Sequence, residues 1–159
     1  MVQEVRQATL TLFQRKVNMN IYFSCSISAG RNDQPVYLSL VDALLQDGHI
    51  VPTAHFSDAN ILALETVMTA DVVFQRDVNW VKGCDALVAE VSTPSHGVGY
   101  EIALAESLGK PIFCCYANGK RVSKMVLGNP YPRYRAIGYQ SSEEAVRHMR
   151  EFLKNIPGE

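Results

Sequence analysis

The sequence has no long run of apolar residues and almost no net charge. Its longest apolar stretches, such as Ile112–Tyr116, fall far short of the roughly 20 residues that a membrane-spanning helix needs. The 15 Lys and Arg residues nearly balance the 16 Asp and Glu residues, which leaves a formal net charge of -1. Such a chain has no field that would hold nucleic acid or an anionic membrane non-specifically. We therefore expect a soluble protein that binds neither nucleic acid nor membrane.

Cysteine is scarce and follows no recognisable pattern. The four cysteines, Cys25, Cys84, Cys114 and Cys115, include no Cys-x-x-Cys pair and no spacing typical of a disulfide framework. The four histidines form no ligand spacing with cysteines or carboxylates. We expect reduced thiols in the cytoplasm, or alternatively in the nucleus of a eukaryotic cell, and we expect neither a metal site nor a cofactor.

What the sequence does contain is the composition of one globular domain. Its 159 residues are 47% hydrophobic and 19% charged, enough to bury about 70% of the surface of the unfolded chain. Residues 1–16 lack the continuous apolar segment of a secretory signal, and Met19 stands just before the first strong strand pattern. We predict an N-terminal extension over residues 1–18 and a single domain over residues 19–159.

Strand and helix patterns alternate along this domain. Apolar and β-branched runs predict five strands, over residues 20–24, 49–52, 84–91, 112–116 and 134–139. Apolar residues spaced by three and four predict the helices between them, from residue 33 to just before Gly48, over 58–83 as two helices or one bent helix, over 100–108 and over 142–153. The alternation predicts an α/β domain of Rossmann or flavodoxin type, with a five-stranded parallel sheet and helices on both faces.

Two polar loops follow the first and third predicted strands, at the edge where such a sheet binds ligands. The loop over residues 24–32 combines hydroxyls, small residues and Arg31 just before a helix N-terminus, where backbone N–H groups and the helix dipole favour an anion. A phosphate could bind there. The alternative is an ordinary connection in which Arg31 is solvated.

The loop over residues 92–101 contains Gly97 and Gly99, which allow a ligand to approach the backbone closely, and then Glu101 in the first turn of a predicted helix. A glutamate at a helix start is usually no more than a favourable dipole contact. The same dipole would keep Glu101 ionised for nucleophilic attack on a sugar carbon. Asp77 either pairs with Arg76 at the surface or points toward the same edge.

Taken together, these segments resemble the 2'-deoxynucleoside 5'-phosphate N-hydrolases of the nucleoside 2-deoxyribosyltransferase superfamily. The matching residues extend over about 20–153 and are Ile21-Tyr22-Phe23, Ser26-Ile27, Gly30-Arg31, Asp33, Asp77, Trp80, Val88–Val91, Pro94-Ser95 and Gly97–Glu101. The combined motifs Tyr-Phe-x-x-Ser-Ile and Ser-x-Gly-Val-Gly-Tyr-Glu are specific, whereas either one alone is not.

The resemblance implies catalytic roles for three residues. Glu101 looks like the nucleophile that attacks C1' of the deoxyribose and forms a glycosyl-enzyme intermediate, which water then resolves. Tyr22 would orient that carboxylate, and Asp77 would protonate the departing base or activate the water. The implied reaction releases a free base and 2-deoxyribose 5-phosphate from a 2'-deoxynucleoside 5'-monophosphate.

The resemblance also implies how this substrate is held. The first loop and Ser95 match positions that bind the 5'-phosphate, and two side chains line the family's pocket. The implied binding residues are Cys25, Ser26, Ile27, Ser28, Ala29, Gly30, Arg31, Tyr37, His55, Ser95 and Gly97. The family is a homodimer with shared sites, and the segment that the partner subunit would contribute is Ser123, Lys124 and Met125. From the residues alone, His55 is either a base contact or a structural histidine.

Other functions remain as alternatives. A nucleoside 2-deoxyribosyltransferase shares the nucleophile but passes the sugar to a second base; the donors of the first loop favour the hydrolase, because an uncharged 5'-hydroxyl needs fewer of them. A phosphoribohydrolase is disfavoured, because its Gly-Gly-x-Gly-Thr-x-x-Glu spacing is not matched around Glu101. A non-catalytic nucleotide-binding module would be expected to lack a catalytic carboxylate, whereas Glu101 and Asp77 are both present.

Overall fold

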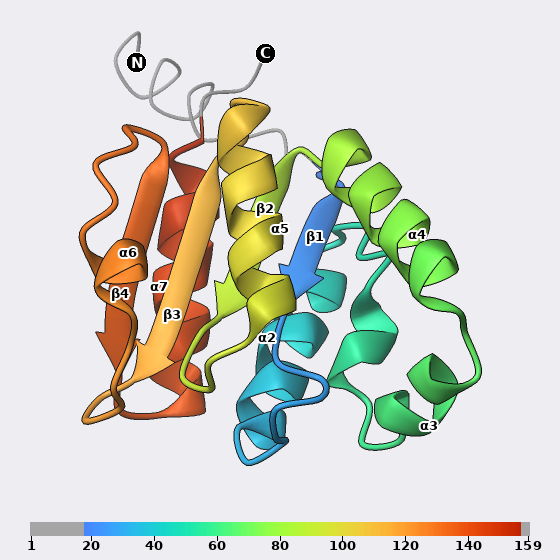
Figure 1. Ribbon diagram of the computed structural model, residues 1–159. Helices are drawn as coiled ribbons and strands as arrows, with labels where there is room; N and C mark the ends of the chain where they lie inside the picture. Colours follow the sequence, from blue (N-terminus) through green and yellow to red (C-terminus); the bar gives the residue numbers. More distant parts are fainter. Residues whose placement is uncertain (1–17, 157–159) are drawn as a thin grey trace, which may run out of the picture.

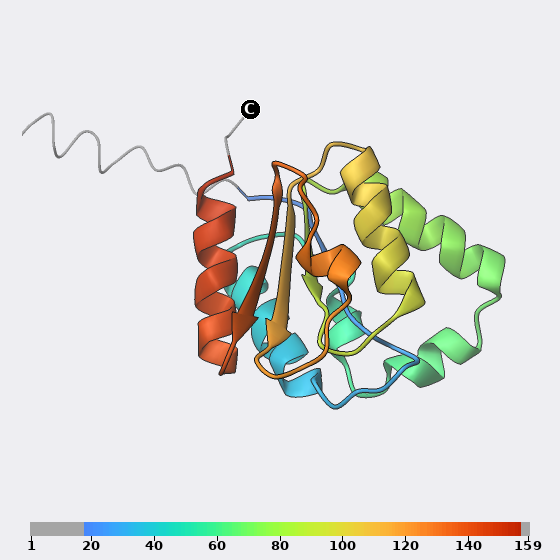
Figure 2. The same cartoon turned by 60° about the vertical axis from the view of Figure 1, so that its left-hand side comes forward.

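The computed structural model describes residues 18–156 and places helices on both faces of a parallel sheet (Figure 1). The strands, in their spatial order, are β1 (Ile21–Ser24), β2 (Ala86–Glu90), β3 (Ile112–Ala117) and β4 (Tyr134–Tyr139). One face is covered by α4 (Ala70–Gly83) and α5 (His96–Ser107), and the other by α2 (Gln34–Gln46) and α7 (Ser142–Lys154) (Figures 1 and 2). The predicted α/β class is confirmed.

The core extends over both faces of the sheet because the residues of its strands are mostly apolar and buried. Every residue of β1 and β2 is buried, as expected for parallel strands that are covered on both sides. On α7, Ala145, Met149 and Leu153 recur at four-residue spacing and are the buried side chains of that helix.

The predicted second strand is wrong, and the sheet has four strands rather than five. Ile50 forms only an isolated parallel bridge with Asn20. Pairing does not extend further because Pro52 has no N–H to donate. The next β1 donor, the Phe23 N–H, instead donates to Thr53 Oγ1 at 2.9 Å.

One helix start also differs from the predicted one. α5 begins at His96 rather than at Tyr100, so the glycine-rich segment forms the first turn of a helix. This earlier start is stabilised by Ser95, whose hydroxyl accepts a hydrogen bond from a backbone N–H of that turn at 3.4 Å. α7 begins at Ser142, as predicted, and is capped by Ser141.

The remaining helical segments are short. Residues 58–83 form two helices, α3 (Ile61–Thr66) and α4, which is one of the two predicted alternatives. They are preceded by a 3-10 helix, η1 (Ala54–Ser57), and a further short helix, α6 (Lys124–Leu127), lies between β3 and β4. The predicted extension lies outside the described residues, apart from residue 18.

The described residues also bear on the expected thiols, metals and membrane. All four cysteines are free and buried. Within residues 18–156, no three potential metal ligands among His, Cys, Asp and Glu are grouped together. No helix of this part of the chain is long and apolar enough to cross a bilayer.

Candidate active site

Glu101 extends from the second turn of α5 toward the end of β1. Ser24, the last residue of β1, donates a hydrogen bond from Oγ to Glu101 Oε2 at 2.5 Å. Tyr22 lies two residues earlier on β1; its buried hydroxyl has no hydrogen bond of ordinary geometry within the described chain, yet it is near enough to lower the pKa of Glu101. Two hydroxyls from one strand therefore flank the carboxylate. Ser24 was not predicted, although the period of two along a strand relates it to Tyr22.

Burial raises the pKa of Glu101 to about 7, and the nearby Asp77 carboxylate raises it too, whereas Ser24 and Tyr22 lower it. The prediction that the helix dipole keeps Glu101 ionised is wrong. α5 starts at His96, so Glu101 lies beyond the first turn, to which the dipole effect is largely confined. Near pH 7 both protonation states of this carboxyl are populated.

Asp77 lies on α4 and faces the same region as Glu101. Its Oδ1 atom accepts a hydrogen bond from Arg76 Nε at 2.7 Å, and its side chain is 15% exposed. Burial raises the pKa of Asp77, while the Arg76 guanidinium opposes that shift. The two predicted alternatives for Asp77 therefore coexist, since it pairs with Arg76 and also interacts electrostatically with Glu101.

Aromatic rings from η1 and α4 form a wall beside Asp77. The ring centroid of His55 is 4.8 Å from that of Phe56 and 5.9 Å from that of Trp80, in edge-to-face arrangements. The Tyr22 ring meets Phe56 at 6.4 Å. His55 is close enough to lower the pKa of Asp77, so it belongs to this cluster. Aromatic rings next to an acid suit a planar base.

The loop between β1 and α2 is fastened by Arg31. Its guanidinium donates to the carbonyl oxygens of Ser26 at 3.0 Å, Phe56 at 2.8 Å and Asp58 at 2.7 Å. It also lies over the ring of the buried Tyr37, 5.2 Å from the centroid. The structure therefore places Arg31 as a clamp between the loop and η1, and neither as a solvated side chain nor as an open phosphate ligand.

The rest of this loop changes from buried to exposed along the chain, from Cys25 and Ser26 through the half-buried Ile27 to Ser28 and Ala29. Burial raises the pKa of the Cys25 thiol to about 12, which keeps it protonated and unreactive. Gly30 has φ of +132°, a conformation that residues with a side chain rarely adopt.

The second predicted phosphate position lies at the start of α5. Ser95 caps this helix, and Gly97 is exposed in its first turn. Thr93, two residues before Ser95, donates from Oγ1 to Asp33 Oδ2 at 2.8 Å and so joins the second loop to the end of the first. The predicted meeting of the two loops at one edge of the sheet is confirmed.

Comparisons with known proteins show the family of this chain. A family model described as nucleoside 2-deoxyribosyltransferase matches residues 21–150. The chain belongs to this family. The 5-hydroxymethyl-dUMP N-hydrolase of Rattus norvegicus is 39% identical over 143 residues, with 87% of each chain covered. Its counterpart from Danio rerio is 36% identical over 142 residues, covering 87% of this chain and 98% of the relative.

A solved structure shares the fold of this deoxyribosyltransferase-family chain. The CMP N-glycosidase of Clostridium botulinum superposes with a TM-score of 0.64 at 19% identity, over 83% of this chain and 98% of that one. The resemblance to deoxynucleoside 5'-phosphate N-hydrolases, first indicated by the two loop motifs, is confirmed by the relatives.

The segment that the family resemblance assigns to a partner subunit lies on α6. Ser123 caps this short helix by accepting a hydrogen bond from the Met125 N–H at 3.2 Å. Lys124 is exposed, and Met125 is 84% exposed. Both views show α5 between α6 and α4, so this segment and α4 lie on opposite sides of α5 (Figures 1 and 2).

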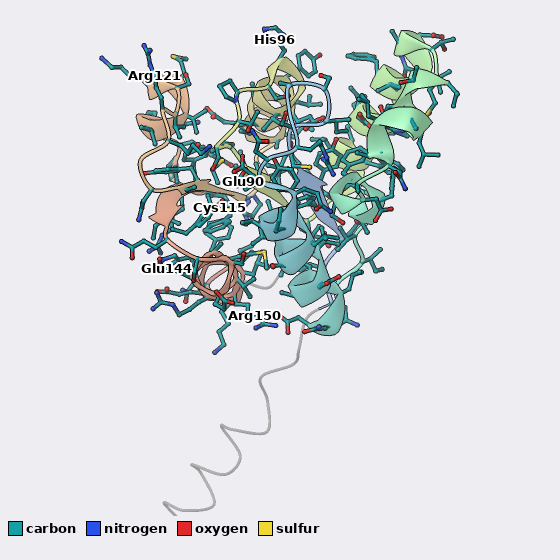
Figure 3. All side chains as sticks on the ribbon, turned by 90° about the horizontal axis from the view of Figure 1, so that it is seen from below. Glu90, His96, Cys115, Arg121, Glu144 and Arg150 are labelled. Atoms are coloured by element: carbon teal, nitrogen blue, oxygen red, sulfur yellow. The ribbon has the colours of Figure 1, made fainter. Side chains whose placement is uncertain are left out.

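A further buried carboxylate, Glu90, was not predicted as part of this family site. It ends β2 and lies beside Cys115 of β3 near the centre of the molecule (Figure 3). It accepts hydrogen bonds from the Ser92 hydroxyl and, at 2.9 Å, from the Tyr139 hydroxyl. Burial raises the pKa of Glu90 to about 7. The carboxylate ties the start of the second loop to β4.

Proposed function

We propose that this protein hydrolyses the N-glycosidic bond of 2'-deoxynucleoside 5'-monophosphates and releases a free base and 2-deoxyribose 5-phosphate. The observation that carries this proposal is the pair of carboxylates, Glu101 on α5 and Asp77 on α4, that face one region beside a wall of aromatic rings. Hydrolysis of this bond in a deoxynucleoside monophosphate is the activity named for relatives that are 36% and 39% identical.

In the first step, the ionised Glu101 attacks C1' of the deoxyribose. A bond forms between a carboxylate oxygen and C1', and the bond from C1' to the base nitrogen breaks with its electron pair going to the base. Asp77 donates a proton to the departing base, a role favoured by the burial that raises its pKa. Ser24 and Tyr22 hold the attacking carboxylate in place.

In the second step, water attacks C1' of the glycosyl-enzyme. The Asp77 carboxylate accepts a proton from that water while Glu101 leaves as a carboxylate, so both residues return to their starting states. A 2'-deoxy sugar suits this route, because it lacks the electron-withdrawing hydroxyl that would oppose positive charge at C1'.

For the 5'-phosphate, the supporting features are the first loop and the start of α5. Backbone N–H groups near Ser28 and Gly97 lie at the edge where the two loops meet, and both residues are exposed to solvent. Arg31 contributes by holding the loop in shape. A partner subunit would add Ser123 and the positive charge of Lys124.

A homodimer is supported by apolar side chains exposed on the helices of one face of the sheet. Tyr100 is 56% exposed and packs against the half-exposed Phe74 at 5.9 Å, and Met125 and Leu127 are exposed on α6. A second copy would cover these residues and bring its own α6 toward the site. We place the reaction in the cytoplasm or nucleus, where four free thiols stay reduced.

The deciding experiment offers the protein a panel of deoxynucleoside monophosphates, deoxynucleosides and ribonucleotides, each with and without an acceptor base. We expect free base and 2-deoxyribose 5-phosphate from the deoxynucleotides, and a much lower kcat/KM for deoxynucleosides, because phosphate donors would be left unpaired. Equal kcat/KM for a deoxynucleoside and its monophosphate, with transfer to the acceptor base, would instead establish a deoxyribosyltransferase. No turnover of any substrate would point to a binding module.

A further inference from the structure

Arg76 makes several contacts at the site beyond its bond to Asp77. Its Nη1 atom is 2.8 Å from Glu65 Oε1, so one guanidinium bridges two carboxylates. The guanidinium also lies over two rings, 5.0 Å from the centroid of Trp80 and 5.4 Å from that of Phe56. With the side chain only 17% exposed, this cation is fixed in place by its neighbours.

The Arg76 charge affects both catalytic carboxyls. It lowers the pKa of Asp77 and, to a smaller extent, that of Glu101, whereas burial raises both. The groups that face Asp77 from the surrounding elements are Arg76, Glu65, His55, Tyr22 and Glu101. Among these, Arg76 is the residue that permanently carries positive charge. Without it, two nearby carboxyls would oppose each other's ionisation.

We propose that Arg76 is a positioning residue for the acid–base carboxylate Asp77, and that Glu65 anchors the guanidinium in the orientation this requires. Nε is directed at Asp77 because Nη1 is held by Glu65 and the guanidinium plane by Trp80. The inference rests on the proposed roles of Asp77 and Glu101. In this inference Arg76 touches no reacting atom, but it sets the orientation and the charge state of Asp77, which does.

The planar guanidinium is what allows these contacts to coexist. Arginine presents several N–H donors in a rigid fork and can stack on an aromatic ring at the same time. A lysine at residue 76 would keep the charge but could not donate in two fixed directions while stacking on Trp80. Arg76→Lys should therefore preserve much of the electrostatic effect and lose much of the positioning.

The test compares the pH dependence of kcat/KM in the wild type, Arg76→Gln and Glu65→Gln. Both variants break the same bridge between α3 and α4, so the loss of that bridge is common to them. Their electrostatic effects are opposite. Arg76→Gln removes a charge that lowers the pKa of Asp77 and Glu101, so both limbs of the profile should move to higher pH. Glu65→Gln removes a charge that raises the pKa of Asp77, so its limb should move to lower pH.

The variants should also differ in which kinetic constant changes. A misplaced acid slows chemistry more than binding, so Arg76→Gln should lower kcat by at least about tenfold with little change in KM. Arg76→Lys should restore the position of the limbs more than it restores kcat. Arg147→Gln is the matched control, because Arg147 pairs with Glu144 on α7, which lies across the sheet from the His96 end of α5 (Figure 3). That control should leave the profile unchanged.

The outcomes separate this inference from the proposed function. If the wild type hydrolyses deoxynucleotides but Arg76→Gln and Glu65→Gln shift the limbs in the same direction, or not at all, Arg76 is a structural clasp and the inference is overturned. If Arg76→Gln does not fold, as judged by circular dichroism, Glu65→Gln decides alone. A shift of the Asp77 limb to lower pH in Glu65→Gln supports the inference, and any other result overturns it. A wild type without glycosidase activity refutes the proposed function instead.

Discussion

Two glutamates, Glu101 and Glu90, have the same raised pKa of about 7 in different surroundings. Glu90 is fully buried and accepts hydrogen bonds from Ser92 and Tyr139. Glu101 is only half-buried, accepts one strong hydrogen bond from Ser24 and faces a second carboxylate, Asp77.

The difference teaches that a raised pKa does not by itself mark a nucleophile. At Glu90 the lone pairs are directed at fixed donors of the protein, so the group holds the second loop against β4. At Glu101 the hydroxyls of β1 leave a carboxylate oxygen for chemistry, and Asp77 can supply a proton. A second carboxylate lies near each glutamate, Asp33 near Glu90 and Asp77 near Glu101, so under the proposed mechanism their hydrogen-bond partners distinguish the two roles.

The strongest test of this comparison exchanges each glutamate for glutamine. We expect Glu101→Gln to lose activity by several orders of magnitude, because the amide keeps the shape of the side chain but cannot act as the nucleophile. Glu90→Gln should retain most of its turnover. Steady-state rates with a deoxynucleoside monophosphate measure both. Near-normal turnover in a folded Glu101→Gln protein would remove the proposed mechanism.

The comparison also predicts that the Glu101 site, unlike the Glu90 network, is completed by a second subunit. Mixing inactive Glu101→Gln subunits with inactive Ser123→Ala/Lys124→Glu subunits should restore activity, because each mixed dimer would contain one site with all its residues intact. Activity is measured after verified subunit exchange. No recovery, or full activity in a verified monomer, would mean that one chain builds the whole site.

A smaller effect is expected from Ser24→Ala. Its hydroxyl lowers the pKa of Glu101, so removing it should raise that pKa and move the corresponding limb of the pH profile to higher pH. Because part of the ionised fraction is lost, kcat/KM below neutral pH should fall by about tenfold. Ser107→Ala, at the other end of α5, is the control and should change neither. An unmoved profile in Ser24→Ala would show that this hydroxyl does not support the ionised carboxylate.

The last prediction concerns the stability of the fold and Glu90, not turnover. Folding raises the pKa of Glu90 from 4.5 to about 7, so the proton is bound more tightly in the folded state. The tighter binding of this proton stabilises the folded state by at most on the order of 3 kcal/mol. The stabilisation is complete below pH 4.5 and is lost as the pH rises through 7. Glu90→Gln should therefore flatten the decrease in the free energy of unfolding between about pH 5 and pH 8, measured by urea denaturation. If the free energy of unfolding of Glu90→Gln decreases equally steeply, the decrease is caused by other groups.

The alternation of strands and helices was readable from the sequence because it depends on local patterns. Continuous apolar runs indicated β2 and β3, and three-four spacing indicated α2 and α7. Parallel connections then bring the loops after β1 and β2 to one edge, which is why these two loops could be predicted to meet, whereas Tyr22 was linked to Glu101 only by the family resemblance. The short second strand failed because a single Pro52 decided how far pairing could extend.

What only the tertiary structure decided are contacts between residues far apart in the chain. The sequence shows Arg31 and Arg76 as two cations near polar segments, but not that the first binds three carbonyl oxygens while the second bridges two carboxylates. It places Glu101 near a helix start, but the cap at Ser95 moved that start and left burial, not the dipole, to set its pKa. The physical reason is that burial and hydrogen bonding depend on which elements pack together, and local periodicity carries no information about that packing.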